Sequence, residues 1–135
     1  MKTPQGGTNQ SERGPTSPTW VGLDHVQVAI PVGGEERARA FYVGVLGLAE
    51  VPKPPVMAAR GGAWFEAGDV RVHVGPEEPF VPARKAHPAI TMVGLRAFVE
   101  AAGVEATWND EIAGVERCHV FDPFGNRIEL IEVTT

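Results

Sequence analysis

An internal repeat limits the folds that this chain can adopt. The segment Arg39–Phe41 recurs as Arg96–Phe98, and the turn Gly68–Asp69 recurs at the same offset as Gly125–Asn126. Self-similarity at one offset is typical of a structural unit that occurs twice in one fold. The sequence therefore predicts two equivalent modules.

Hydrophobic periodicity gives each module the element order βαβββ, an α+β fold. Strands are expected where apolar and polar residues alternate, and helices where apolar residues recur every three to four positions. In the first module the expected strands span residues 20–31, 48–51, 63–67 and 70–75, with a helix at 35–46 and a loop at 52–62. In the second module they span 87–93, 104–108 and a closing hairpin at 117–133, with a helix at 95–102.

The length of 135 residues and a hydrophobic content of 43% suit one domain with a packed core. Residues 1–19 are rich in Pro, Gly, Ser and Thr and carry almost no aliphatic side chains, so we expect a disordered tail. They also lack the apolar stretch of a signal peptide. The domain is expected to cover 20–135, with module one at 20–75, a Pro-rich connector at 76–86 and module two at 87–135.

Composition excludes several classes of partner. A net charge of −5 without a basic run makes the chain a poor candidate for binding nucleic acid or an anionic membrane surface. No apolar run approaches the length needed to span a bilayer. The single cysteine, Cys118, rules out an internal disulfide and, with no signal peptide, favours the cytoplasm.

The closing hairpin contains the residue that first indicates a function. Its turn, Asp122–Asn126, consists mainly of residues that favour turns. In the strand that follows, Glu129 lies between Ile128 and Leu130. A carboxylate inside a hydrophobic strand is costly unless it is exposed, paired or bound to a metal. Glu129 is therefore a candidate for one of these roles.

The repeat supplies counterparts for Glu129. It aligns His25 with His87, each opening the first strand of its module, and His73 with Glu129, each on the fourth strand. If these strands converge, three imidazoles and one carboxylate form a ligand set for divalent Zn, Ni, Fe or Mn. One residue of slip between the turn and the polar pattern would turn His73 to the other face of its strand. The alternation of valines with Arg71 and His73 favours the cleft-facing interpretation.

Each of these residues also has a structural interpretation. His25 and His87 lie at strand ends, where an imidazole can simply be exposed to solvent. Glu129 could form an ion pair with Arg127 or Arg71.

Three further side chains are interpreted as structural. His119 lies between Cys118 and Val120 in the seventh strand. Cys118 is interpreted as a small buried hydrophobe because no activating partner is evident. Trp64 is assigned to core packing.

With these residues in place, the chain resembles the vicinal oxygen chelate superfamily, which includes glyoxalase I, fosfomycin-resistance thiol transferases, extradiol dioxygenases and bleomycin-binding proteins. The resemblance covers roughly residues 22–133 and lies in LDHVQVAI, in ARAFYVGVLGL, in HPAITM with LRAFVEAAGVE, and in DPFGNRIELIE. It implies a glyoxalase-like fold, in which two βαβββ modules form a curved mixed sheet around a cleft. It also implies metal ligands on the first and fourth strands of each module, here His25, His73, His87 and Glu129. Glyoxalase I has glutamate where this chain has His73, a departure that argues against the glyoxalase reaction itself.

The resemblance implies a metal-dependent lyase, isomerase or thiol transferase acting on a small molecule that chelates the metal through adjacent oxygens. In such an enzyme the metal stabilises developing negative charge, and Glu129 or His73 would move a proton as a catalytic residue. The substrate-binding candidates are Gln27, Arg71 and Arg127 on the cleft face and Arg84 and Lys85 on the connector. Two alternatives stay open: a metal-free antibiotic-binding protein of the bleomycin-resistance type, and an extradiol-type Fe(II) dioxygenase. A homodimer is a further expectation.

Overall fold

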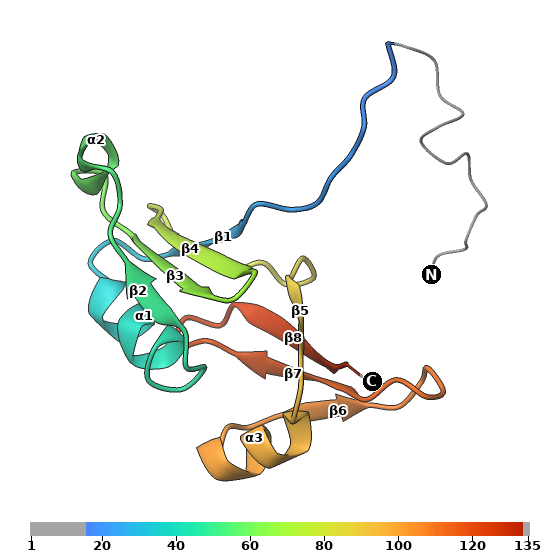
Figure 1. Cartoon of the computed structure of the whole chain (residues 1–135). Coiled ribbons are helices and arrows are strands. Elements are labelled where there is room, and N and C mark those ends of the chain that lie inside the picture. Colours follow the sequence, from blue (N-terminus) through green and yellow to red (C-terminus); the bar gives the residue numbers. More distant parts are fainter. Residues whose placement is uncertain (1–15, 134–135) are drawn as a thin grey trace.

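The computed structural model describes residues 16–133, and Figure 1 shows the order of their elements. The first module contains β1 (Val26–Ile30), α1 (Glu35–Tyr42), β2 (Ala49–Val51), α2 (Pro55–Ala58), β3 (Ala63–Ala67) and β4 (Val70–Pro76). The second contains β5 (Ala89–Met92), α3 (Leu95–Ala102), β6 (Thr107–Asn109), β7 (Arg117–Phe121) and β8 (Arg127–Glu132).

Each module forms its own four-stranded mixed sheet (Figure 1). The strand order is β1-β4-β3-β2 in the first module and β5-β8-β7-β6 in the second. In both sheets the first strand runs parallel to the fourth, and all other neighbours are antiparallel. The two predicted βαβββ modules of an α+β fold are therefore confirmed.

The hydrogen-bonding register fixes which residues of the two fourth strands are equivalent. His73 of β4 lies opposite Gln27 of β1, and Glu129 of β8 lies opposite Ala89 of β5. His73 and Glu129 thus occupy the same place in their sheets, as the repeat predicts. The residue two positions before Gln27 is His25.

The same register relates the remaining strands. His87 stands two positions before Ala89, so it is the counterpart of His25. On the third strands, Trp64 lies opposite His73 and His119 lies opposite Glu129. Trp64 and His119 are therefore equivalent as well.

Strand alternation gives each sheet one apolar face and one polar face. The apolar faces contribute to a single hydrophobic core, which α1 completes. Its fully buried members include Ile30, Tyr42, Phe65, Val72, Leu95, Val120 and Ile128. The histidines and Glu129 lie on the polar faces, so core packing holds the strands that carry them.

Buried polar contacts join the two modules at the β7–β8 turn. The Tyr42 hydroxyl of α1 donates to Oδ2 of Asp122 at 2.8 Å. The Asn126 side chain donates to the carbonyl of Ala29 in β1 at 2.8 Å and to Oδ2 of Asp122 at 2.8 Å. The turn residues that the sequence singled out therefore also connect the modules.

Some element boundaries differ from those predicted. The first strand begins at Val26 rather than at residue 20, because Val21 and Leu23 are 96% and 84% exposed and β4 pairs only with residues from Val26 onward. The predicted loop 52–62 contains the short helix α2, which has a proline at its start.

Most of the predicted tail 1–19 lies outside the described residues. Within residues 16–133, none of the helices is long and apolar enough to cross a membrane.

Candidate metal centre

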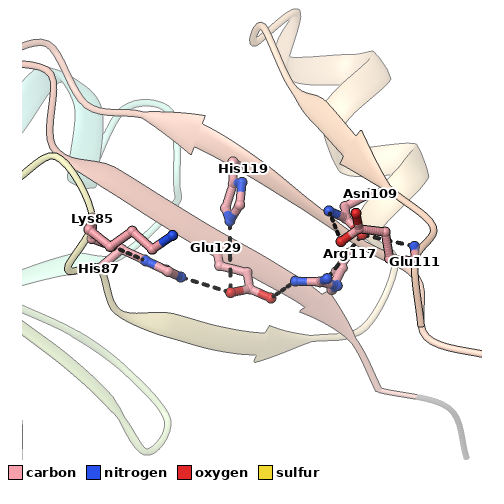
Figure 2. Close-up of polar contacts among 7 residues, drawn as sticks. All are labelled: Lys85, His87, Asn109, Glu111, Arg117, His119 and Glu129. Atoms are coloured by element: carbon pink, nitrogen blue, oxygen red, sulfur yellow. Dashed lines mark hydrogen bonds and ion pairs between the residues drawn. The ribbon is translucent and has the colours of Figure 1, made fainter. Parts of the chain in front are cut away.

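Three ligand-type side chains meet on the polar face of the second sheet (Figure 2). Nε2 of His87 lies 2.9 Å from Oε1 of Glu129, and Nε2 of His119 lies 3.9 Å from the same oxygen. One ligand atom from each residue falls within 4.8 Å of the other two. We call His87, His119 and Glu129 the module-two cluster.

The two ring nitrogens of His87 have different partners. Nδ1 lies 2.8 Å from the carbonyl oxygen of Lys85, which can only accept, so Nδ1 carries a proton. Nε2 faces Oε1 of Glu129. A bare Nε2 lone pair would be repelled by this carboxylate, so the position favours a proton or a cation between the two atoms. With a cation between them, Nε2 and Oε1 would both act as ligands, and the carbonyl of Lys85 would fix the tautomer.

Arg117 of β7 holds the other oxygen of Glu129. Its Nη1 donates to Oε2 at 2.9 Å, and its Nη2 donates to Oδ1 of Asn109 at 2.9 Å. Burial raises the pKa of Glu129, but hydrogen bonds from His87 and Arg117 outweigh it, so the pKa lies below its usual value. The Glu129 carboxylate is therefore ionised at neutral pH and held at both oxygens.

The equivalent place in the first module carries a stack of three rings. The ring centroids of His25 and His73 are 3.9 Å apart, and those of His73 and Trp64 are 4.2 Å apart with the planes 5° from parallel. His73 is 5% exposed, and burial, followed by the nearby His25, lowers its pKa. His73 is therefore neutral at pH 7 and can act as a ligand or accept a proton.

Charged side chains surround this stack. Oδ2 of Asp24 lies 2.9 Å from Nδ1 of His25. Arg71 has carboxylate oxygens of Asp24 and Glu66 at 3.8 Å and 3.7 Å. Together with Met57 of α2, these residues border a cavity of about 340 Å³. That volume suits a small molecule.

The four ligands predicted from the sequence lie together as two pairs. His25 contacts His73, and His87 contacts Glu129. In the described part of the chain, no hydrogen bond, ion pair or ring contact joins one pair to the other. One chain thus presents two separate pairs of candidate ligands, one on each sheet.

The predicted substrate-binding residues fall in different environments. Gln27 is exposed on β1, close to His25 in the sequence. Arg71 already forms ion pairs with Asp24 and Glu66. Arg127 lines a second cavity, of about 430 Å³, together with His87. Arg84 and Lys85 are exposed on the connector.

Sequence reasoning missed three residues of the site. His119, interpreted as structural, faces His87 and Glu129, and Trp64, assigned to the core, stacks on His73. Arg117, rather than Arg71 or Arg127, pairs with Glu129. The alternation of residues in β7 could have revealed Arg117 and His119. Cys118 and Val120 are buried on one face of the strand, so the residues between and beside them lie on the polar face.

The donor set of the module-two cluster fits a divalent transition metal. Two imidazoles and a carboxylate are the usual ligands of such ions in proteins. The Nδ1 hydrogen bond of His87 and the Arg117 contact of Glu129 provide the outer-shell orientation that ligating side chains need.

The solved structures that this chain is similar to include a glyoxalase family protein from Bacillus anthracis. It shares 43% sequence identity with a TM-score of 0.83, and the alignment covers 88% of this chain and 100% of that one. The fosfomycin resistance protein FosX from Listeria monocytogenes has 15% identity and a TM-score of 0.65, with coverage of 86% and 96%. Lactoylglutathione lyase from Agrobacterium tumefaciens has 19% identity and a TM-score of 0.59, with coverage of 85% and 94%. No protein-family model and no curated protein matches the chain.

Proposed function

Because this chain belongs to the glyoxalase family of the vicinal oxygen chelate superfamily, we propose that it is a metal-dependent enzyme acting on a small molecule with two adjacent oxygens. The observation that carries the proposal is the His87–Glu129 pair, in which Nε2 of His87 and Oε1 of Glu129 lie 2.9 Å apart. The fold neighbours include a fosfomycin resistance protein and a lactoylglutathione lyase, so the proposed reaction stays as broad as the lyase, isomerase or thiol transferase that the resemblance implies. Activity assays with candidate substrates would identify the specific reaction.

We propose His25, His73, His87 and Glu129 as the full ligand set. Since one chain holds them as two separate pairs, we infer a homodimer in which the His25–His73 pair of one copy meets the His87–Glu129 pair of the other. A two-fold axis is compatible with this arrangement, because a contact between module one of one copy and module two of the other is then repeated in reverse and gives two identical sites.

A metal bound there would supply a Lewis acid for negative charge developing on the substrate oxygens. The protein side chains divide the remaining work. Glu129 is fixed by Arg117 and ionised, so it suits a permanent ligand. Among the described residues His73 is held by ring contacts and is neutral, so it is the better candidate to give up its place as a ligand and accept the substrate proton at an imidazole nitrogen. Gln27, Arg71, Arg127, Arg84 and Lys85 are proposed to contact the substrate.

One observation favours a second candidate. His87, His119 and Glu129 together make a two-histidine, one-carboxylate set within a single chain. Such a set with open positions is typical of Fe(II) oxygenases. An extradiol-type dioxygenase would use His119 as a ligand and would not need His25 or His73.

Metal analysis of purified protein tests these proposals. Protein is incubated with Zn, Ni, Mn or Fe(II), desalted and assayed for bound metal, with Glu129→Ala as the negative control. The dimeric enzyme requires that His25→Ala weakens binding and that His119→Ala leaves it nearly unchanged. The opposite pattern, with Fe(II) preferred, supports the dioxygenase. Protein that retains none of the four metals would contradict both candidates and favour a metal-free ligand-binding protein of the bleomycin-resistance type.

The cytoplasmic location stays a prediction.

A further inference from the structure

We propose that Arg127 is the anchor for an oxyanion, so that the ligand of this site is a small molecule carrying a carboxylate or phosphonate next to an apolar group. The proposal rests on the proposed function only in placing the anion beside the metal centre. It narrows the set of candidate substrate-binding residues to one.

The repeat shows how Arg127 differs from its counterpart. Arg71 and Arg127 occupy equivalent positions, each two residues before His73 or Glu129 on the fourth strand. Across the sheet, Arg71 lies opposite Glu66, and Arg127 lies opposite Phe121.

This difference changes the charge balance around each arginine. Glu66 lies 3.7 Å from Nε of Arg71, and Asp24 adds a second carboxylate at 3.8 Å from Nη1. Phe121 supplies no charge. The first module therefore neutralises its arginine within the chain, whereas the second module leaves Arg127 without an anion.

Arg127 has no polar partner among residues 16–133. No hydrogen bond or ion pair is made by its guanidinium there, and its Nε is buried without an acceptor. Nε of Arg117 is also buried without an acceptor, but its guanidinium pairs with Glu129, and that of Arg71 pairs with two carboxylates. A half-buried cation without a counter-ion is costly, and an incoming oxyanion would remove that cost.

The surroundings of Arg127 define the rest of the ligand. Arg127 and His87 line the same cavity of about 430 Å³, so a molecule held by Arg127 lies next to a candidate metal ligand. The other walls are mainly apolar, formed by Val26, Val28, Ala29, Val81, Ala83 and Ala86. Phe121, 51% exposed, adds apolar surface opposite Arg127. Glu77 is the acidic residue of this cavity; it forms no ion pair with Arg127 within the described chain and would exclude ligands with a second anion on that side.

The test measures oxyanion binding in full-length protein, both stripped of metal with a chelator and reloaded with Zn. Phenylphosphonate and phenylacetate are the probes, and phenylacetamide is the neutral control, all titrated by calorimetry. We expect both anions to bind metal-free protein more tightly than the amide. Arg127→Gln should weaken anion binding at least about tenfold, because hydrogen bonds to charged groups contribute about 1.5–3 kcal/mol. A preference for one anion identifies the head group.

Two further variants separate a direct contact from a folding defect. Phe121→Glu recreates the carboxylate that Arg71 has, so it should also reduce anion binding at least about tenfold, while Phe121→Gln should not. Arg127→Lys keeps the charge and should give an intermediate affinity. Arg60→Gln removes an exposed arginine outside the cavity and controls for net charge.

The proposal is overturned if Arg127→Gln and Phe121→Glu bind the anions like the natural protein, or if phenylacetamide binds equally well. A loss in Arg60→Gln as large as that in Arg127→Gln would also overturn it. If the protein retains no metal but still binds the anions through Arg127, the Arg127 inference holds and the proposed metal-dependent enzyme is wrong. If the protein binds metal normally but Arg127→Gln does not change anion binding, the proposed enzyme holds and the Arg127 inference is wrong.

Discussion

Nε2 of His87 lies 2.9 Å from Oε1 of Glu129, while Nδ1 of the same ring is already committed to the carbonyl of Lys85. The ring can satisfy both neighbours in only two ways. Either His87 is a doubly protonated cation paired with the carboxylate, or a bound cation takes the place of the Nε2 proton. Metal binding and proton binding are therefore exclusive at this nitrogen.

The first prediction is that metal binding releases a proton wherever Nε2 of His87 is protonated, and so weakens as the pH falls, because the metal takes the place of that proton beside Glu129. Calorimetry of Zn binding in buffers with different ionisation enthalpies measures the proton count. His87→Ala should lose most of the affinity. Tight binding that neither releases protons nor weakens at low pH would mean that the ion does not bind at Nε2 of His87.

Replacing Glu129 with glutamine should lower the free energy of unfolding by about 2 kcal/mol in metal-free protein. The change leaves Arg117 as a partly buried cation without its carboxylate, which costs less than the full penalty for a completely buried charge. Urea denaturation checks this value. In the double variant Glu129→Gln with Arg117→Gln, much of the loss should be recovered. A double variant with the two losses simply added would show that the pair is not coupled.

The first module should lose stability as the pH falls below about 6.5. The pKa of His73 in the folded chain lies below its usual 6.5, so the unfolded chain binds more protons in this range. The stability that neutral His73 contributes is therefore complete above pH 6.5 and is lost as the pH falls towards the lower, folded value. His25, Asp24, Glu66 and Lys53 also act on this ring.

Thermal melts between pH 7.5 and 5 measure this dependence, with His73→Gln as the comparison. The variant should show a flatter profile than the natural chain over this range. Parallel profiles would assign the pH dependence to other groups.

Asp122→Ala should destabilise the protein by about 3 kcal/mol. The Asp122 side chain accepts hydrogen bonds from the backbone N–H groups of Phe124 and Asn126, from the Asn126 side chain and from the Tyr42 hydroxyl. Their loss leaves buried donors unpaired, at a cost of about 1–3 kcal/mol for each group that water does not reach. Tyr42→Phe, which removes only one of these bonds, should cost about 1 kcal/mol in the same denaturation experiment. Equal losses would show that the Tyr42 bond carries the whole effect.

The fold was readable from the sequence because the repeat, the turn chemistry and the strand alternation all pointed to the same two modules. Residues such as Val72 and Val74 are buried in the structure for the reason that their alternation suggests. The start of β1 was placed too early, since Val21 and Leu23 have the composition of a strand but no neighbouring strand to pair with. Pairing depends on the tertiary fold and leaves little trace in a local pattern.

Within the site, Glu129 could be recognised because a carboxylate among aliphatic residues is anomalous. His119 was harder to recognise, because the alternation with Cys118 and Val120 places it on the polar face but does not give it a role, and the Glu129 partner that reveals its role is on the next strand. Selecting Arg117 required the side-chain geometry, since Arg127 is much nearer to Glu129 in the sequence, yet the ion pair is made by Arg117 on the neighbouring strand.

The contact between Tyr42 and Asp122 also bears on how the chain matures during translation. Helix α1 comes from the first third of the sequence, but the carboxylate that its tyrosine needs belongs to the last hairpin. A nascent chain that has not yet released β7 and β8 from the ribosome must keep the Tyr42 hydroxyl exposed to water or to a chaperone. The Tyr42–Asp122 contact between the two modules therefore forms late, after nearly all of the domain has been synthesised. Stalled or truncated chains would leave the Tyr42 hydroxyl exposed.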